Sequence, residues 1–451
     1  MIHGGLRYLE HYEFGLVRDA LSEREKIWSI APHIVWPMRF VLPQLPGGRP
    51  GWLIRLGLFL YDHIGKRKLL PASRSVNLER DVAGHDLRGA ISKGVEYSDC
   101  WVDDARLVVL NARDAADRGA QIHPCTRVVS IAREADEWAV TVTGQAGERS
   151  VYRAKALVNA AGPSAEAVLS ENAIPSTTSS RLVRGSHIVV KKLFDHEKAY
   201  FCQNEDGRIF FAIPYEDDFT LIGTTDADHN GPPTGVTASS DEVHYLCDAS
   251  NRYFKHQIDA GDVIWAYSGV RPLIDDGSDK PESATRGFRL ELEGGENGKA
   301  GLLSVFGGKI TSYRELAEEA CDLLGTWLPH MSRDSWTADE ALPGGNFPVS
   351  KVPELCDDLE VKYPFLPKPL VRRFLRTYGT QSWQFLGSAQ SLADMGEHFG
   401  HGLYQSEVDH LLQNEWATCA QDILWRRTKM GLRLDAQQQQ TLSDYIERAR
   451  A

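Results

Sequence analysis

Residues 156–163 read ALVNAAGP, a short apolar run that ends in small residues and a proline. Such a run, bounded by turn-forming residues, is typical of a buried strand that leads into a sharp turn. Before it, residues 105–119 (ARLVVLNARDAADRG) have helical spacing and stop at a glycine. Between these stretches, alternating apolar residues predict strands at 122–123, 127–133, 138–143 and 150–152. This order of elements indicates an α/β fold.

The rest of the chain divides by pattern. Residues 9–30 have helical spacing, whereas alternating stretches between residues 184 and 226 predict a large mixed sheet. The last hundred residues are helical, and 406–428 are expected to form one helix. We expect three regions: a nucleotide half-domain at 1–180, a sheet domain at 181–340 that returns to the first near 300–325, and an all-α domain at 341–451.

Composition excludes several classes of protein. The 451 residues are 42% apolar and 25% charged, as in a globular protein, and the net charge of −12 argues against a nucleic-acid partner. The seven cysteines contain no CxxC pair, which favours a reducing compartment and argues against a zinc site; no metal site is expected. We find neither a signal-like N-terminus nor an apolar run of about 20 residues, so we expect a cytoplasmic location or attachment from the cytoplasmic side.

Residues 52–68 (WLIRLGLFLYDHIGKRK) are apolar and end in basic residues. One interpretation is a buried helix with a charged end. The other is a helix that lies on a membrane, with its apolar face in the lipid boundary and its basic residues at the headgroups.

Eight strings in one order resemble the FAD-dependent, aerobic (respiratory) glycerol-3-phosphate dehydrogenase family. One string alone would be weak support, but the eight span nearly the whole chain. They are IHGGLRYLE (2–10), EYSDCWVDDARL (96–107), NAAGP (159–163), RGSHIVV (184–190), IGTTD (222–226), YSGVRPL (267–273), SVFGGKIT (304–311) and LWRRTK (424–429).

The resemblance implies a fold and an activity. The fold is α/β: an FAD/NAD(P)-binding domain of the two-dinucleotide type, an interleaved mixed-sheet substrate domain and a C-terminal helical cap. The activity is oxidation of sn-glycerol 3-phosphate to dihydroxyacetone phosphate, with electrons passed through FAD to quinone. It also implies peripheral attachment to the cytoplasmic face of the inner membrane, through 52–68, and a possible homodimer.

One part of the family pattern is missing from the 451 residues. The family opens with a strand, a GxGxxG turn and a helix that bind the pyrophosphate of FAD, whereas the motif after that unit begins here at residue 2. Two explanations are open: the chain is a non-catalytic remnant, or translation starts further upstream. For these 451 residues alone we expect weak flavin binding and poor solubility.

Basic residues in the motifs are the candidates for holding a phosphate dianion. Arginine binds phosphate through two parallel hydrogen bonds and stays charged. Arg271 in YSGVRPL is the first choice, because the resemblance places it beside the reactive face of the flavin. Arg7 and Tyr8 in GGLRYLE are further candidates, and Arg286 is a weaker one. The alternative for each arginine is a structural or solvated role.

Two histidines and one lysine are the candidates for the chemistry. His187 in RGSHIVV is the preferred general base because imidazole titrates near working pH, and His3 is its rival. The resemblance implies that Lys309, with Arg271 and His187, is catalytic and lies near the pyrimidine edge of the flavin. Contacts with FAD are implied for His3, Gly4, Gly5, Val128, Asn159, Ala161, Gly162, Gly307, Gly308 and Lys309.

A second flavoenzyme class remains open at this point. An amino-acid oxidase relative would share the fold and bind a carboxylate. The three cations at 7, 271 and 309 favour a dianionic substrate over a carboxylate.

Overall fold

The structure of the chain is a computed structural model, and it describes the main part of the sequence. The described residues are 1–45, 50–65, 67–89, 91–204, 206–275, 277, 286–295, 299–329 and 334–450, and for residues 7, 10 and 11 only the backbone.

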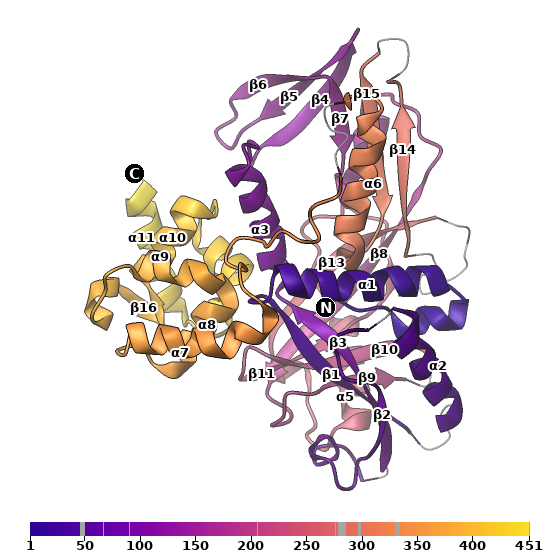
Figure 1. Ribbon diagram of the computed structural model, residues 1–451, viewed down its shortest axis with the longest axis vertical. Helices are drawn as coiled ribbons and strands as arrows, with labels where there is room; N and C mark the ends of the chain where they lie inside the picture. The colour runs from indigo at the N-terminus through magenta and orange to yellow at the C-terminus, as the bar shows by residue number, and fades with distance from the viewer. Residues whose placement is uncertain are drawn as a thin grey trace.

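A mixed nine-stranded sheet forms the centre of the molecule (Figure 1). Its strands follow the order β12-β8-β11-β10-β9-β1-β3-β2, and β13 pairs with β8. The predicted stretches between 184 and 226 are strands, as expected. The strands are β1 Val35–Pro43, β2 Arg74–Asn77, β3 Lys93–Val102, β8 Ser180–Lys191, β9 Ala199–Gln203, β10 Ile209–Tyr215, β11 Phe219–Gly223, β12 Ala227–Asp228 and β13 Val263–Ile274.

Helices cover both faces of this sheet because its strands are apolar on both sides. The helix α5 (Ser240–Tyr253) packs on one face with Tyr200, Phe210 and Ile222. On the other face the core joins Phe40 and Tyr97 with three N-terminal segments. These segments are η1 (Leu6–His11), α1 (Phe14–Ile30) and α2 (Gly51–Ile64).

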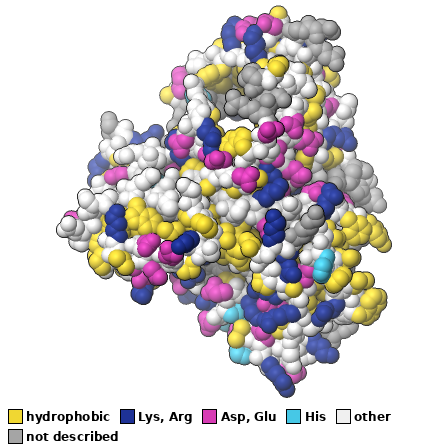
Figure 2. Space-filling model, viewed as in Figure 1, with side chains coloured by type: hydrophobic (Ala, Val, Ile, Leu, Met, Phe, Trp, Pro, Cys, Tyr) yellow, Lys and Arg dark blue, Asp and Glu magenta, His cyan; other side chains and the backbone are white. Residues whose placement is uncertain are grey.

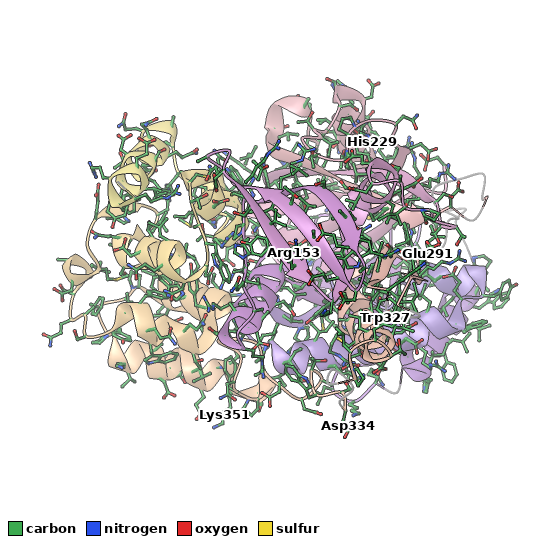
Figure 3. All side chains as sticks on the ribbon, turned by 90° about the horizontal axis from the view of Figure 1, so that it is seen from above. Arg153, His229, Glu291, Trp327, Asp334 and Lys351 are labelled. Carbon is green, nitrogen blue, oxygen red and sulfur yellow. The ribbon has the colours of Figure 1, made fainter. Side chains whose placement is uncertain are left out.

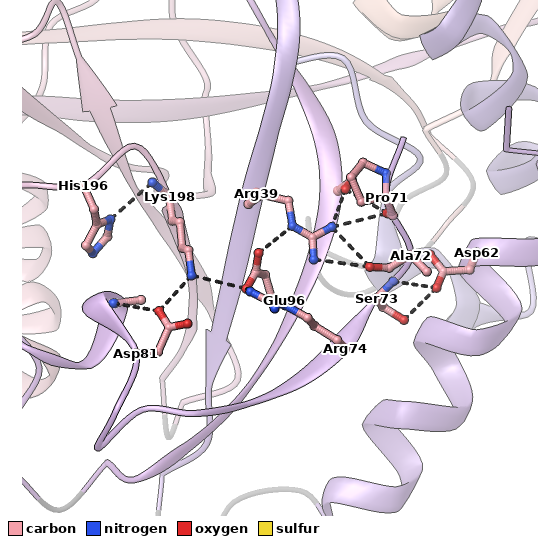
Figure 4. Close-up of polar contacts among 12 residues, drawn as sticks. Arg39, Asp62, Pro71, Ala72, Ser73, Arg74, Asp81, Glu96, His196 and Lys198 are labelled. Carbon is pink, nitrogen blue, oxygen red and sulfur yellow. Dashed lines mark hydrogen bonds and ion pairs between the residues drawn. The ribbon is translucent and has the colours of Figure 1, made fainter. Parts of the chain in front are cut away.

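A charge cluster closes one edge of the sheet (Figure 4). The buried Glu96 on β3 accepts hydrogen bonds from Arg39 Nε at 2.6 Å and Arg74 Nη2 at 2.9 Å. Lys198 Nζ lies 3.3 Å from Glu96 and 2.7 Å from Asp81. Burial alone would raise the pKa of Glu96, but hydrogen bonds from both arginines and the charge of Lys198 lower it. Every charge in this cluster has an opposite partner.

Two small sheets extend the molecule away from α1. β7 (Ala156–Asn159) pairs in parallel with β15 (Gly301–Gly307), which pairs with β14 (Phe288–Glu293). The chain near residue 300 therefore lies beside the strand at 156–159. Among the described residues β7 has no partner on its other edge, and Val158 is 43% exposed. The second small sheet contains β4 (Arg127–Glu134), β5 (Glu137–Thr143) and β6 (Arg149–Ala154).

Three helices accompany the small sheets. They are α3 (Asp104–Asp117), α4 (Ala165–Glu171) and α6 (Tyr313–Gly325). The helix expected at 105–119 is confirmed as α3. The strand predicted at 122–123 is wrong: these residues form an irregular connection between α3 and β4. Two residues are too few to specify a strand that has no partner to pair with.

The C-terminal residues form a helical lobe beside the sheets, seen from above in Figure 3. Its core joins residues from Leu359 to Ile446. The lobe contains α7 Val352–Lys362, α8 Lys368–Tyr378, α9 Ser382–Leu386, β16 His398–Gly400, β17 Leu403–Tyr404, α10 Gln405–Asn414, η11 Asp422–Arg427 and α11 Ala436–Arg450.

The single helix predicted at 406–428 is wrong. α10 ends at Asn414, and the chain resumes helical form in η11, a π-helix. Glu415 turns into the interior to pair with Arg106 of α3, and Trp416 has a φ of 53°, which ends the helix. The buried charge pair therefore overrides the helical pattern of the sequence.

α2 presents an apolar face outward. Trp52 is 69% exposed and Phe59 57%, together with Leu53, Leu56 and Leu60. Figure 2 shows apolar side chains gathered on the side of the molecule where α2 lies. In the described part of the chain, every helix is too short or too polar to cross a bilayer.

Candidate active site

One cavity of about 450 Å³ lies where η1, the large sheet and the segment after β15 meet. Its wall includes seven residues that the sequence singles out. They are His3, Gly5, Tyr8, Arg271, Arg286, Gly308 and Lys309. Side chains about 300 residues apart in the sequence, such as His3 and Lys309, thus line the same cavity. Aromatic residues of the sheet, among them Phe40 and Phe211, form another part of the wall.

Arg271 projects from β13 across β8. Its guanidinium lies flat over Gly185, where an added Cβ would come within 2.6 Å of it. Nη2 donates to Thr224 Oγ1 at 3.1 Å, and Nη1 makes a short contact with Asp226. Thr224 and Asp226 line the cavity too. The arginine is therefore held in a fixed orientation at the cavity wall.

The ammonium of Lys309 is buried and has no carboxylate partner in the described part of the chain. Its Nζ lies 3.7 Å from the centre of the Tyr8 ring, and has no hydrogen-bond acceptor among the described residues. Burial lowers the pKa of this ammonium from 10.5 to about 7. Gly307 and Gly308 before it have φ of 70° and 92°, a conformation that favours glycine.

The two histidine candidates occupy different places. The ring of His187 stacks on Tyr267, with centroids 5.0 Å apart, and lies over Gly223, where a Cβ would meet it at 2.2 Å. Burial first, and Arg271 second, lower its pKa to about 3. His3 lines the cavity, and burial and Lys309 lower its pKa to about 3. Both imidazoles are neutral at pH 7.

The segment around His3 is tied to α2. The Gly4 N–H donates to Tyr61 Oη at 2.8 Å, and this hydroxyl lies 2.8 and 2.9 Å from the two oxygens of Asp99. Arg24 Nη1 donates to Asp99 at 2.6 Å. A buried chain of hydrogen bonds therefore fixes the backbone of the cavity wall at Gly4.

Several predicted residues lie outside the cavity wall, namely Gly4, Val128, Asn159, Ala161, Gly162, His187 and Gly307. Val128 is on the exposed surface of β4, and the Asn159 side chain donates to Ala165 O at 2.9 Å inside the small sheet. Ala161 and Gly162 follow β7, and Gly162 has a φ of 56°. The side chain of Arg7 lies outside the described residues.

The sequence predictions missed four residues that shape the site. Gly185 and Gly223 are glycines in the interior of strands, a position that marks a close approach of another group. That signal was present in the motifs RGSHIVV and IGTTD. The roles of Thr224 and Asp226 depend on contacts between distant segments, which no local pattern encodes.

The part of this site around Lys309 fits the ring system of a flavin. Lys309 supplies an uncompensated cation, and Gly307 and Gly308 present backbone without side chains. A cation beside the ring suits the negative charge that a flavin gains on reduction. The described residues contain no glycine-rich turn followed by a helix N-terminus that would suit the pyrophosphate.

Comparisons with known proteins agree with this arrangement. Residues 1–314 match the family described as FAD dependent oxidoreductase, and residues 335–448 match the C-terminal domain of alpha-glycerophosphate oxidase. The glycerol-3-phosphate dehydrogenase of Pseudomonas aeruginosa is 50% identical over 448 residues, which cover 99% of this chain and 86% of the relative.

Two further relatives are nearly as similar. The aerobic glycerol-3-phosphate dehydrogenase of Escherichia coli is 46% identical, over 99% of this chain and 88% of the relative. The D-erythritol 1-phosphate dehydrogenase of Brucella abortus is 48% identical, over 100% of this chain and 89% of the relative.

A solved structure supports the fold. The glycerol-3-phosphate dehydrogenase of Bacillus halodurans, complexed with FAD, matches with a TM-score of 0.75 and 22% identity, over 94% of this chain and 83% of that one. The predicted α/β fold with a C-terminal helical domain is confirmed. FAD is confirmed as the cofactor. The chain is a member of the FAD-dependent glycerol-3-phosphate dehydrogenase family.

Proposed function

We propose that this protein oxidises the secondary alcohol of sn-glycerol 3-phosphate to dihydroxyacetone phosphate, and that quinone takes the electrons from the reduced flavin. The observation that carries the proposal is the meeting of Arg271, Arg286 and Lys309 on one cavity. Three cations around one cavity of an acidic protein suit a small dianion.

The phosphate is bound by the arginines. Arg271 is oriented by Thr224 and Asp226, so it loses little side-chain freedom when it binds. Arg286 and Tyr8 line the same cavity, and Arg7 is a further candidate from the adjacent η1. A bound dianion also offsets the charge of Arg271, which otherwise holds down the pKa of His187.

His187 takes the hydroxyl proton on its imidazole. The ring is neutral before substrate binds, because burial and Arg271 lower its pKa. His3 remains the rival base, since it lines the cavity. Lys309 is placed to stabilise negative charge on the substrate oxygen or on the ring beside it.

FAD, when bound, would supply the acceptor for the hydride of the substrate carbon. We propose that Gly4, Gly5, Gly307 and Gly308 contact its ring through backbone, together with His3. Asn159, Ala161, Gly162 and Val128 are proposed to lie along the rest of the cofactor. The small residues Ala161 and Gly162 permit close approach, and Val128 is proposed to act through its backbone.

The electron acceptor implies a membrane surface. We propose that α2 lies on the cytoplasmic face of the inner membrane, with Trp52, Leu56 and Phe59 in the lipid boundary. The exposed apolar face of α2 supports this, as do the basic residues that follow it. Quinone is dissolved in the same lipid.

D-erythritol 1-phosphate is a second candidate substrate, because the enzyme named for it is 48% identical to this chain. Both substrates carry a secondary alcohol next to a phosphorylated carbon, and they differ by one carbon in length. A site that binds one through its phosphate will accept the other unless the cavity excludes the extra carbon.

The test is single-turnover reduction of the flavin by each substrate, followed by steady-state turnover with a short-chain quinone. We expect faster reduction with sn-glycerol 3-phosphate than with D-erythritol 1-phosphate, and no reduction with amino acids. Bound flavin that neither phosphate reduces would refute the proposal. Faster reduction by the four-carbon compound would reassign the substrate.

A flotation assay with anionic vesicles tests the membrane contact separately. Trp52→Ser combined with Phe59→Ser should lower the bound fraction without changing single-turnover flavin reduction. Equal flotation of the variant and the wild type would show that α2 does not hold the protein on lipid.

A further inference from the structure

We propose that Trp425 of the C-terminal domain is a positioning residue for the reaction: a stack of four rings connects it to His187 and fixes the orientation of that imidazole. The inference rests on the proposed role of His187 as the base. It also gives a function to the LWRRTK motif, which lies outside the cavity.

The four rings follow one another without a gap. His187 and Tyr267 lie parallel, at 7° and 5.0 Å between centroids. Tyr267 and Trp265 are 4.7 Å apart, and Trp265 and Trp425 are 4.4 Å apart at 28°. Tyr267 pairs directly with His187 between β13 and β8. Trp265 and Tyr267 point to the same side of β13, because they are two residues apart.

His187 depends on this stack for its orientation. Its Nδ1 is buried and has no hydrogen-bond partner among the described residues. The usual device for orienting a catalytic imidazole, a hydrogen bond to one ring nitrogen, is therefore missing at this atom. One face of the ring is covered by Tyr267, and the strand at Gly223 leaves no room for a side chain beside it.

The far end of the stack is equally confined. A Cβ at Gly431 would come within 2.3 Å of the Trp425 ring, so the indole fills the space between Gly431 and Trp265. The backbone around it is anchored as well: Arg427 Nη2 donates to Glu415 O at 2.6 Å. A glycine thus lies against a ring at each end of the stack.

Phosphate binding should be independent of the stack. Arg271 lies on the same strand, β13, but is oriented by Thr224 and Asp226. Loss of the indole should therefore loosen His187 and leave the phosphate contact in place. The expected signature is a fall in kcat without a rise in KM.

The experiment compares Trp425→Leu, which removes the outer ring, with Trp425→Phe, which keeps an aromatic face. Trp383→Leu is the matched control, because Trp383 packs on the core of the same domain but has no ring contact with the stack. The first readout is the NMR resonance of His187 in the full-length, ¹³C-histidine-labelled protein, assigned with His187→Gln. The second is kcat, KM and the pH profile with sn-glycerol 3-phosphate.

Trp425→Leu should move the His187 resonance, lower kcat by about 10- to 100-fold and shift the pH profile, because small misplacements of a catalytic group have effects of that size. Trp425→Phe should restore most of the rate, and Trp383→Leu should leave the resonance in place. An unchanged His187 resonance in Trp425→Leu overturns the inference, and so do equal kinetic losses in Trp425→Leu and Trp383→Leu. If the wild type fails to oxidise the substrate, the proposed function fails, while the resonance still decides whether Trp425 positions His187.

Discussion

Two buried sites in this molecule differ in whether their positive charge has a carboxylate partner. At the junction with the C-terminal domain, Arg106 is 0% exposed and binds Glu415, which is 2% exposed, through Nη1 and Nη2. Arg427 adds a second cation to the same carboxylate. In the cavity, the Lys309 ammonium has no carboxylate partner in the described part of the chain. The paired charges at the junction hold the fold together, whereas the Lys309 ammonium is available to a ligand.

The cluster around Glu96 in Figure 4 belongs to the first kind. Each of its cations is bound to a carboxylate, and none of them lines the cavity. The contrast separates structural cations from ligand-binding ones, and the following experiments test it from the largest expected effect to the smallest.

Glu415→Gln should lower the free energy of unfolding by about 3–5 kcal/mol, because it leaves the buried Arg106 uncompensated. Denaturant unfolding measures the change. The control is Glu354→Gln, at an exposed pair with Lys351, where about 0.5 kcal/mol or less is expected. Equal effects at both sites would refute the structural role of the junction.

The same carboxylate predicts a pH dependence. Burial would raise the pKa of Glu415, but the charge and hydrogen bonds of Arg106, with His410 3.7 Å away, lower it to about 2 from 4.5. A depressed carboxylate pKa stabilises the fold above pH 4.5, and this contribution is lost as the pH falls from 4.5 to about 2. Glu415→Gln should flatten that part of the stability curve.

Lys309→Met should leave stability unchanged or raise it, since it removes a buried charge without a partner. It should lower kcat/KM by about 10²- to 10³-fold, the usual cost of losing a group that stabilises developing charge. Lys155→Met, at a surface pair with Asp136, is the control and should keep full activity. A destabilised Lys309→Met with normal kinetics would place Lys309 among the structural cations.

Gly223→Ala should lower kcat by about tenfold, because the new methyl displaces the His187 ring from its position over the strand. Gly15→Ala in α1 is the control, since nothing lies within 4 Å of a Cβ there. Normal turnover in Gly223→Ala would remove His187 from the catalytic assignment and favour His3.

Binding of inorganic phosphate at pH 8.5 should take up a proton. The pKa of Lys309 is lowered to about 7, so the side chain is largely neutral at this pH, and a dianion beside it raises that pKa. Calorimetry in two buffers with different ionisation enthalpies measures the uptake. Its persistence in Lys309→Met would assign the proton to another group.

Local sequence patterns were sufficient to predict most of the strands and helices. The alternating stretches of the large sheet, the hairpin strands and the return strand near residue 300 are recognisable because each face of a strand repeats every second residue. The pattern failed at Glu415, where a helical sequence is broken by a charge pair with a residue 309 positions away. It failed again at 122–123, where too few residues were available to specify pairing.

The site was predictable where motifs carry the chemistry, and not where distant segments meet. Arg271 and Lys309 stood out as cations next to glycines and turns, and both line the cavity. The stack joins His187 on β8 to rings on β13 and η11. Contacts between strands and a distant helix have no signature in any one segment. The roles proposed for these residues remain predictions.

The hydrogen bond from Gly4 to Tyr61 has a practical consequence for work on this enzyme. Tyr61 belongs to the same helix that presents Trp52 and Phe59 outward. Deleting that helix to obtain an easily handled protein would strip the acceptor from Gly4 and uncover the Asp99 carboxylate beneath it. Lipid contact can be studied cleanly only by exchanging the outward side chains, one helical face at a time, with the inward face kept intact.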